Sequence, residues 1–304
     1  MLDPTRKPDY VPAAFFLHFD PAYHRAPAAV EKHLEYFHYT GMDFVKIQYE
    51  KRFPSLPHIQ KPEDWAAMPF YGPDFYAEAL AVVEGLVKAA KPEALVVLTL
   101  YSPFMCAVHT AGEEAVNRHI LEAPEKVQRG MQIITESLAG FVRDCIRAGL
   151  DGFYTSTQGG EADRFPNVSY FNQCVKPYDL ALMQEINQAC SFNILHVCDY
   201  QRPNGNLTRF LDYPGQVVNA GLELVGRTLT PRQAAELFGR PFMGGLDRKG
   251  PLLTGTPQQA RAAALQVLAT APERFILGAD CTVPSQVSWD NLKAAIDAAH
   301  TYHR

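Results

Sequence analysis

The chain has 304 residues, of which 47% are hydrophobic and 20% are charged, and its formal net charge is −5. This composition is typical of a soluble globular enzyme, and the acidic balance argues against a nucleic-acid partner, which favours a basic surface. No apolar run approaches the roughly 20 residues of a membrane-spanning helix, and the polar first residues are unlike a signal peptide. We therefore expect a cytoplasmic protein with reduced thiols and no membrane contact.

Short apolar runs rich in β-branched and aromatic residues alternate with longer stretches of helical spacing. Strands are predicted over residues 13–19, 43–49, 95–102, 151–157, 192–198, 216–221, 242–247 and 275–280. Helices are predicted over residues 27–39, 75–90, 123–148, 169–189 and 288–302, and after the Thr-Pro pairs at 230–231 and 256–257. Eight strands alternating with helices predict an α/β fold, a single (β/α)8 TIM barrel over residues 1–304. A doubly wound sheet is the alternative, although no GxGxxG turn follows the first strand.

The C-terminal ends of barrel strands carry the chemistry of such enzymes. Polar residues gather at these ends: His18, Asp20, Lys46, Gln48, Glu50, Tyr101, Ser102, 155–158, His196, Cys198, Asp199, Asn219, Asp247, Asp280 and Cys281. We expect an active-site cleft there, lined by the catalytic candidates His18, Lys46, Gln158 and Asp247. Lys46 lies between Val45 and Ile47, so it needs either a function or a buried ion pair with Asp43 or Glu50.

A metal site is predicted at the end of the fifth strand. His196 and Cys198 are two residues apart, so on a strand they point to the same face. Zinc favours this mixture of nitrogen and sulfur ligands. Cys281, at the end of the eighth strand, is the best third ligand, and three protein ligands with one open position are typical of catalytic zinc. The alternative is that both cysteines are core packing residues, which we expect of Cys106, Cys145, Cys174 and Cys190.

With these strand ends assembled, the sequence resembles the uroporphyrinogen decarboxylase (URO-D) superfamily. The segments that carry the resemblance are DGFYTSTQGG at 151–160, ILHVCD at 194–199, LDYPGQVVN at 211–219, FMGGLD at 242–247 and RFILGADCTVPSQVSWDNLKAAIDAA at 274–299. The resemblance implies one somewhat distorted (β/α)8 barrel with a deep cleft and a tendency to form homodimers. It is closest to the branch of zinc-dependent corrinoid and thiol methyltransferases, whose His-x-Cys and distant Cys map onto His196, Cys198 and Cys281.

The resemblance leaves two reaction classes open. A methyltransferase would use zinc to activate a thiol. The other side of the transfer would be a small methylated compound or a corrinoid, either free or on a partner protein. A decarboxylase of porphyrin biosynthesis would need no metal, but the arginines that follow its first strand are missing from the matching stretch at 16–23. A barrel that only binds a corrinoid or tetrapyrrole is a third reading. No acidic fourth ligand stands in a clear motif, although Glu223 and Asp280 are considered.

Overall fold

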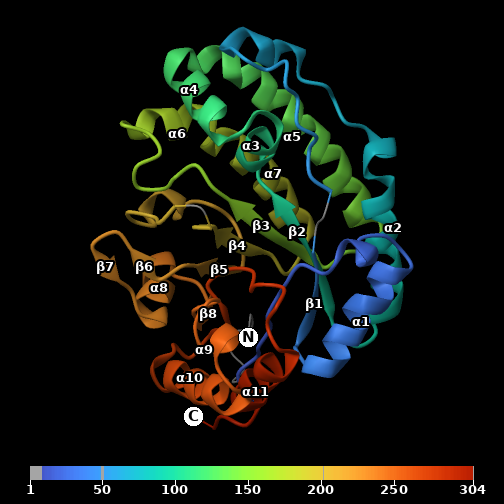
Figure 1. The fold of residues 1–304 in the computed structure, drawn as a ribbon, viewed down its shortest axis with the longest axis vertical. Helices are drawn as coiled ribbons and strands as arrows, with labels where there is room; N and C mark the ends of the chain where they lie inside the picture. Colours follow the sequence, from blue (N-terminus) through green and yellow to red (C-terminus); the bar gives the residue numbers. More distant parts are fainter. Residues whose placement is uncertain (1–8, 49–50, 201, 304) are drawn as a thin grey trace.

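The computed structural model describes residues 9–48, 51–200 and 202–303 of the chain. Its centre is a curled parallel sheet of seven strands in the order β1-β2-β3-β4-β5-β8-β9 (Figure 1). The strands are β1 (Phe44–Ile47), β2 (Leu95–Tyr101), β3 (Gly152–Thr157), β4 (Ile194–Val197), β5 (Val217–Ala220), β8 (Phe242–Leu246) and β9 (Phe275–Ala279). Nearly every strand residue is buried, which explains why these strands read as continuous apolar runs: both faces of the sheet are covered.

Helices cover the outside of the curled sheet (Figure 1). The main ones are α1 (Ala28–Thr40), α2 (Pro73–Ala90), α5 (Pro124–Arg147), α7 (Lys176–Ala189), α8 (Pro231–Phe238), α10 (Pro257–Thr270) and α11 (Trp289–His300). The Thr-Pro starts are as predicted: the hydroxyls of Thr230 and Thr256 accept bonds from the backbone N–H groups of Gln233 and Gln259. In the described residues no helix is long and apolar enough to cross a membrane.

The predicted strand at 13–19 does not form a regular strand. It makes two isolated bridges, from Ala13 to Leu277 and from Leu17 to Val283. Side chains also bond its backbone: the Asp43 carboxylate accepts from the Ala13 N–H, and the Tyr36 hydroxyl donates to the Phe15 carbonyl. The segment thus lies beside β9 without continuing the ladder. The α/β architecture and the parallel sheet are confirmed. Among the described residues this sheet has seven regular strands, not the eight of the predicted barrel.

Several elements were not predicted. Between β2 and α5 lie α3 (Pro103–Ala111) and α4 (Glu113–Glu122), and the predicted helix at 169–189 is divided into α6 (Val168–Cys174) and α7. The short elements are the 3-10 helices η1 (Pro21–Tyr23), η2 (Pro62–Ala67) and η3 (Thr208–Phe210), the hairpin β6 (Glu223–Leu224) and β7 (Arg227–Thr228), and α9 (Pro251–Thr254). Buried Trp65 of η2 donates to His119 of α4 at 3.1 Å. The long connection after β1 is therefore packed against the helices after β2.

Candidate metal centre and cleft

The structure brings His196, Cys198 and Cys281 together. His196 is on β4, Cys198 follows that strand directly, and Cys281 lies two residues beyond the end of β9. Their potential ligand atoms are all within 4.8 Å of one another, and all three residues are buried. His196 Nε2 lies 3.4 Å from Cys281 Sγ. Donor atoms on one tetrahedral zinc, each at roughly 2.0–2.3 Å, lie about 3.3–3.8 Å apart, so the His196–Cys281 distance suits a single ion.

The surroundings of these three residues favour a thiolate. Hydrogen bonds from Cys281 and His196 hold the pKa of Cys198 well below the usual thiol value, whereas donating to Cys198 raises the pKa of Cys281. The His196 ring is stacked on Tyr154, with centroids 4.9 Å apart. Its buried Nδ1 has no hydrogen-bond partner among the described residues. A deprotonated sulfur beside an unsatisfied imidazole is a suitable donor set for zinc.

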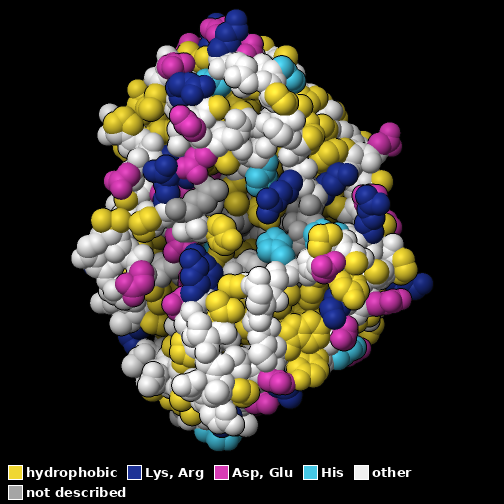
Figure 2. Space-filling model, in the orientation of Figure 1, with side chains coloured by type: hydrophobic (Ala, Val, Ile, Leu, Met, Phe, Trp, Pro, Cys, Tyr) yellow, Lys and Arg dark blue, Asp and Glu magenta, His cyan; other side chains and the backbone are white. Residues whose placement is uncertain are grey.

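The three residues open onto a cavity of about 450 Å³. Its polar lining includes His18, Arg52, Thr99, His109, Ser156, Gln158, Tyr200, Arg248 and Lys249. Among the described residues that line it there is no aspartate or glutamate. Burial lowers the pKa of His109 to about 4, so this imidazole is neutral near pH 7. Figure 2 shows basic and histidine side chains around the hollow in the middle of this face. The cavity therefore favours an anionic or electron-rich ligand.

Arg248 connects the two loops that carry the cysteines. Its Nη1 lies 3.3 Å from Asp199 Oδ1 and also contacts the Asp280 carboxylate. Its backbone N–H donates to Asp280 Oδ1 at 2.7 Å. Asp199 follows Cys198, and Asp280 precedes Cys281. Burial raises the pKa of both carboxyl groups. Gly221 makes room for this arrangement, because a Cβ atom there would lie 2.0 Å from Asp199 Oδ2.

Lys46 does not line the cavity itself but is hydrogen-bonded to Gln48, which does. Its ammonium donates to Gln48 Oε1 at 2.6 Å and lies over the rings of Phe16 and Tyr154. Since an ammonium can only donate, Gln48 must turn its NH₂ toward His18 Nε2, 3.0 Å away. This fixes His18 Nε2 as the acceptor. Asp43 instead contacts His300 at 2.9 Å, and Glu50, the other predicted partner of Lys46, lies outside the described residues.

The predicted site residues do not all reach the cavity. His18 and Gln158 line it. Asp247 is exposed, is not among the lining residues, and accepts a bond from the Lys249 N–H at 2.7 Å. Its placement differs from the prediction because Gly244 and Gly245 have φ of 143° and 97°, which interrupts the side-chain alternation of β8. Arg248 enters the cavity in its place.

The two acidic residues considered as a fourth ligand are engaged elsewhere. Glu223 lies on the short hairpin and accepts from Thr228 at 2.8 Å, and Asp280 is paired with Arg248. Sequence reasoning missed Arg248, His109 and Tyr200. The signal for Arg248 was its place beside Asp247 at a strand end. His109 gave no signal, because α3 itself was not predicted.

Comparison with known proteins agrees with the fold and the resemblance. Residues 38–302 match the family described as uroporphyrinogen decarboxylase (URO-D), and the chain belongs to this family. A methyltransferase from Methanosarcina mazei is similar in structure, with a TM-score of 0.74, 16% identity and coverage of 96% of this chain and 94% of that one. No curated protein sequence matches the chain.

A second similar structure is a B12-independent methionine synthase from Shewanella sp. W3-18-1 in complex with selenomethionine. Its TM-score is 0.59 at 12% identity, over 97% of this chain and 94% of that one. At such identities the likeness to both structures concerns the fold alone.

Proposed function

We propose that this chain is a zinc-dependent methyltransferase that moves a methyl group between a corrinoid or small methylated compound and a thiol. The observation that carries the proposal is the buried His196–Cys198–Cys281 cluster at the wall of the cavity. Three protein ligands that leave one position open are the form that zinc takes in catalytic sites. When bound there, zinc would lower the pKa of a substrate thiol, so that the nucleophilic thiolate exists near neutral pH.

The residues of the cavity suggest what the substrates share. Arg52 and Lys249 supply positive charge, and no described carboxylate lines the wall. A small thiol or methyl compound with an anionic group would therefore be attracted and oriented. His18, held by Gln48, offers a polar contact on the same wall. A corrinoid, free or on a protein docked at the mouth, is the partner that the family resemblance implies.

Metal analysis of the purified protein tests this proposal. The wild type is expected to contain about one zinc per chain, and Cys198→Ala and Cys281→Ala are expected to lose it. Cys190→Ala is the matched control, because Cys190 is also a buried thiol but contacts the Leu150 carbonyl. Methyl transfer from methylcobalamin to small anionic thiols then tests the activity. A wild type that stays metal-free after zinc supplementation would contradict the mechanism.

The alternative is a decarboxylase acting on a tetrapyrrole, the activity in the family's description. It would need paired cations for a substrate with many carboxylates. Three Arg or Lys side chains line the described cavity, and one of them, Arg248, is already paired with two aspartates. This count favours the methyltransferase. A metal-independent loss of carbon dioxide from a porphyrinogen would reverse the preference.

A further inference from the structure

Gln158 stands out because its side chain meets a sulfur atom. Its Nε2 donates to Cys198 Sγ at 3.4 Å, and the residue is 5% exposed. A thiolate can only accept, so the amide must present its NH₂ group to it. The bond spans neighbouring strands, since Gln158 follows β3 and Cys198 follows β4, and the Cys198 N–H donates to the Thr157 carbonyl.

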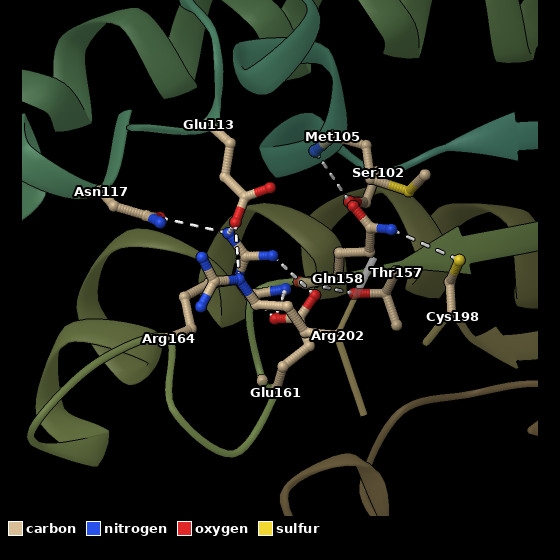
Figure 3. Close-up of polar contacts among 12 residues, drawn as sticks. Ser102, Met105, Glu113, Asn117, Thr157, Gln158, Glu161, Arg164, Cys198 and Arg202 are labelled. Carbon is tan, nitrogen blue, oxygen red and sulfur yellow. Dashed lines mark hydrogen bonds and ion pairs between the residues drawn. The ribbon is translucent and has the colours of Figure 1, made fainter. Parts of the chain in front are cut away.

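The loop that carries Gln158 is fixed by a buried ion pair (Figure 3). Glu161 and Arg164 form a two-point pair with N–O distances of 2.5 and 2.9 Å, and their side chains are 1% and 0% exposed. The same Glu161 carboxylate accepts from the Gly159 N–H at 2.9 Å. It thus holds the residue next to Gln158 directly.

Further contacts leave this loop little freedom. Gly159 has a φ of 98°, and a Cβ atom on Gly160 would lie 2.4 Å from the Phe210 ring. Arg209 donates to the Gly160 carbonyl at 3.1 Å. Arg164 is itself held at 3.3 Å by both Glu113 and Asn117 of α4. These contacts anchor the two-residue glycine turn that follows Gln158, and the buried Gln158 amide lies against Cys198.

We propose that Gln158 is a positioning residue that tunes the Cys198 thiolate through its N–H bond, and that the buried Glu161–Arg164 pair holds it in place. The inference rests on the metal site of the proposed function. A hydrogen bond to a metal-bound thiolate withdraws electron density from the sulfur, so the sulfur donates less to the ion. A zinc ion that receives less electron density from Cys198 would polarise a substrate thiol at its open position more strongly.

Cobalt substitution gives a readout that a merely structural role would not move. In Co²⁺-loaded protein the thiolate-to-cobalt charge-transfer band reports the electron density on sulfur. Gln158→Leu is expected to shift this band to lower energy, because the sulfur regains electron density. It is also expected to weaken metal affinity about 10-fold in chelator competition, because the lost orientation of Cys198 outweighs the stronger donation of its sulfur. Gln158→Glu, which keeps the length of the side chain but replaces its NH₂ donor by an acceptor, is expected to shift the band in the same direction. Asn291→Ala is the control: Asn291 is a buried amide that donates to Leu252 and Gly255, so its loss lowers Tm and leaves the band in place.

A double-mutant cycle tests the ion pair. Glu161→Gln is expected to shift the band in the same direction as Gln158→Leu, and the double variant is expected to match Gln158→Leu alone, because Glu161 acts through Gln158. Arg164→Lys, which keeps the charge but loses the fork, serves if Glu161→Gln does not fold. A wild-type band that Gln158→Leu leaves unmoved, or additive shifts, would overturn this inference alone. A wild type that binds no cobalt would overturn the metal site as well.

Discussion

Two ion-pair networks reach the candidate metal ligands, and they differ in burial and in charge balance. The first is Glu161 with Arg164, whose side chains are 1% and 0% exposed. It touches the site through Gln158. The second is Arg248 between Asp199 and Asp280, whose side chains are 9%, 14% and 21% exposed. It touches the site through the residues next to Cys198 and Cys281.

The charge balance suggests what each network does. In the first, the carboxylates of Glu161 and Glu113 are matched by the guanidinium groups of Arg164 and Arg202. In the second, one guanidinium serves two carboxylates, which leaves negative charge beside the three ligands. A neutral network with a fully buried Glu161–Arg164 core fixes a conformation, whereas a partly hydrated network with surplus negative charge favours a bound cation. We therefore expect the first to matter most for stability and the second most for metal affinity.

The largest effect is expected when the fully buried pair loses one member. Arg164→Met leaves the Glu161 carboxylate buried without its cation, which costs about 3–5 kcal/mol of unfolding free energy. Urea unfolding measures the loss. The double variant Glu161→Gln/Arg164→Met removes both charges, so most of that stability is expected to return. A single variant within about 1 kcal/mol of the wild type would show that water reaches Glu161 after all.

Asp179 differs from the carboxylates of both networks, because it is fully buried and forms no ion pair with the described residues. Asp179 Oδ2 accepts from Thr157 at 2.5 Å and from Tyr213 at 3.1 Å, and burial raises the pKa of Asp179 to about 7. The folded state then binds the proton more tightly than the unfolded chain, whose carboxyl has a pKa near 3.8. Stability from this group is therefore full below pH 4 and is lost as the pH rises to about 7.

The variant Asp179→Asn isolates this effect. Between pH 5 and pH 8 the wild type is expected to lose roughly 2–3 kcal/mol more unfolding free energy than Asp179→Asn. Urea unfolding at the two pH values gives the difference. Equal pH dependence in the two proteins would mean that burial does not raise the pKa of Asp179.

Features of the site that depend on strand periodicity could be predicted from the sequence, whereas contacts between separate loops could not. The His196–Cys198 pair follows from strand alternation. Its meeting with Cys281 follows from the predicted barrel, because β5 and β8 lie between β4 and β9 and only a curled sheet brings their ends together. The position of Asp247 outside the cavity could not be predicted, because two positive-φ glycines interrupt the side-chain alternation of β8. Arg248 joins three separate loops. Glu161 and Arg164 are three residues apart, but the contacts of Arg164 with Glu113 and Asn117 involve α4, an unpredicted helix. Local periodicity carries no signal for contacts of this kind.

Arg248 is expected to affect metal binding more than folding. Arg248→Met removes the bridge between the Cys198 and Cys281 loops. The lost orientation of the two ligands is expected to outweigh the gain in negative charge and to lower metal affinity about 10–100-fold. Chelator competition measures the affinity, and urea unfolding of the metal-free protein measures stability. Arg248→Lys keeps the charge but loses the fork, so an intermediate affinity is expected. If metal affinity stays unchanged while stability falls by several kcal/mol, the assignment of roles to the two networks is reversed.

The smallest effect is expected at the outer end of the buried network. Arg202 pairs with Glu113 at 2.7 Å, but its side chain is 45% exposed, so solvent screens the pair. Arg202→Ala is expected to change unfolding free energy by only about 0–1 kcal/mol and to leave metal affinity unaltered, because Arg164 keeps its bonds to Glu161. Urea unfolding and chelator competition on this variant, run beside Arg164→Met, measure how steeply the contribution of an ion pair grows with burial. A loss comparable to that of Arg164→Met would mean that the four charges act as one unit whose outer member is as important as its core.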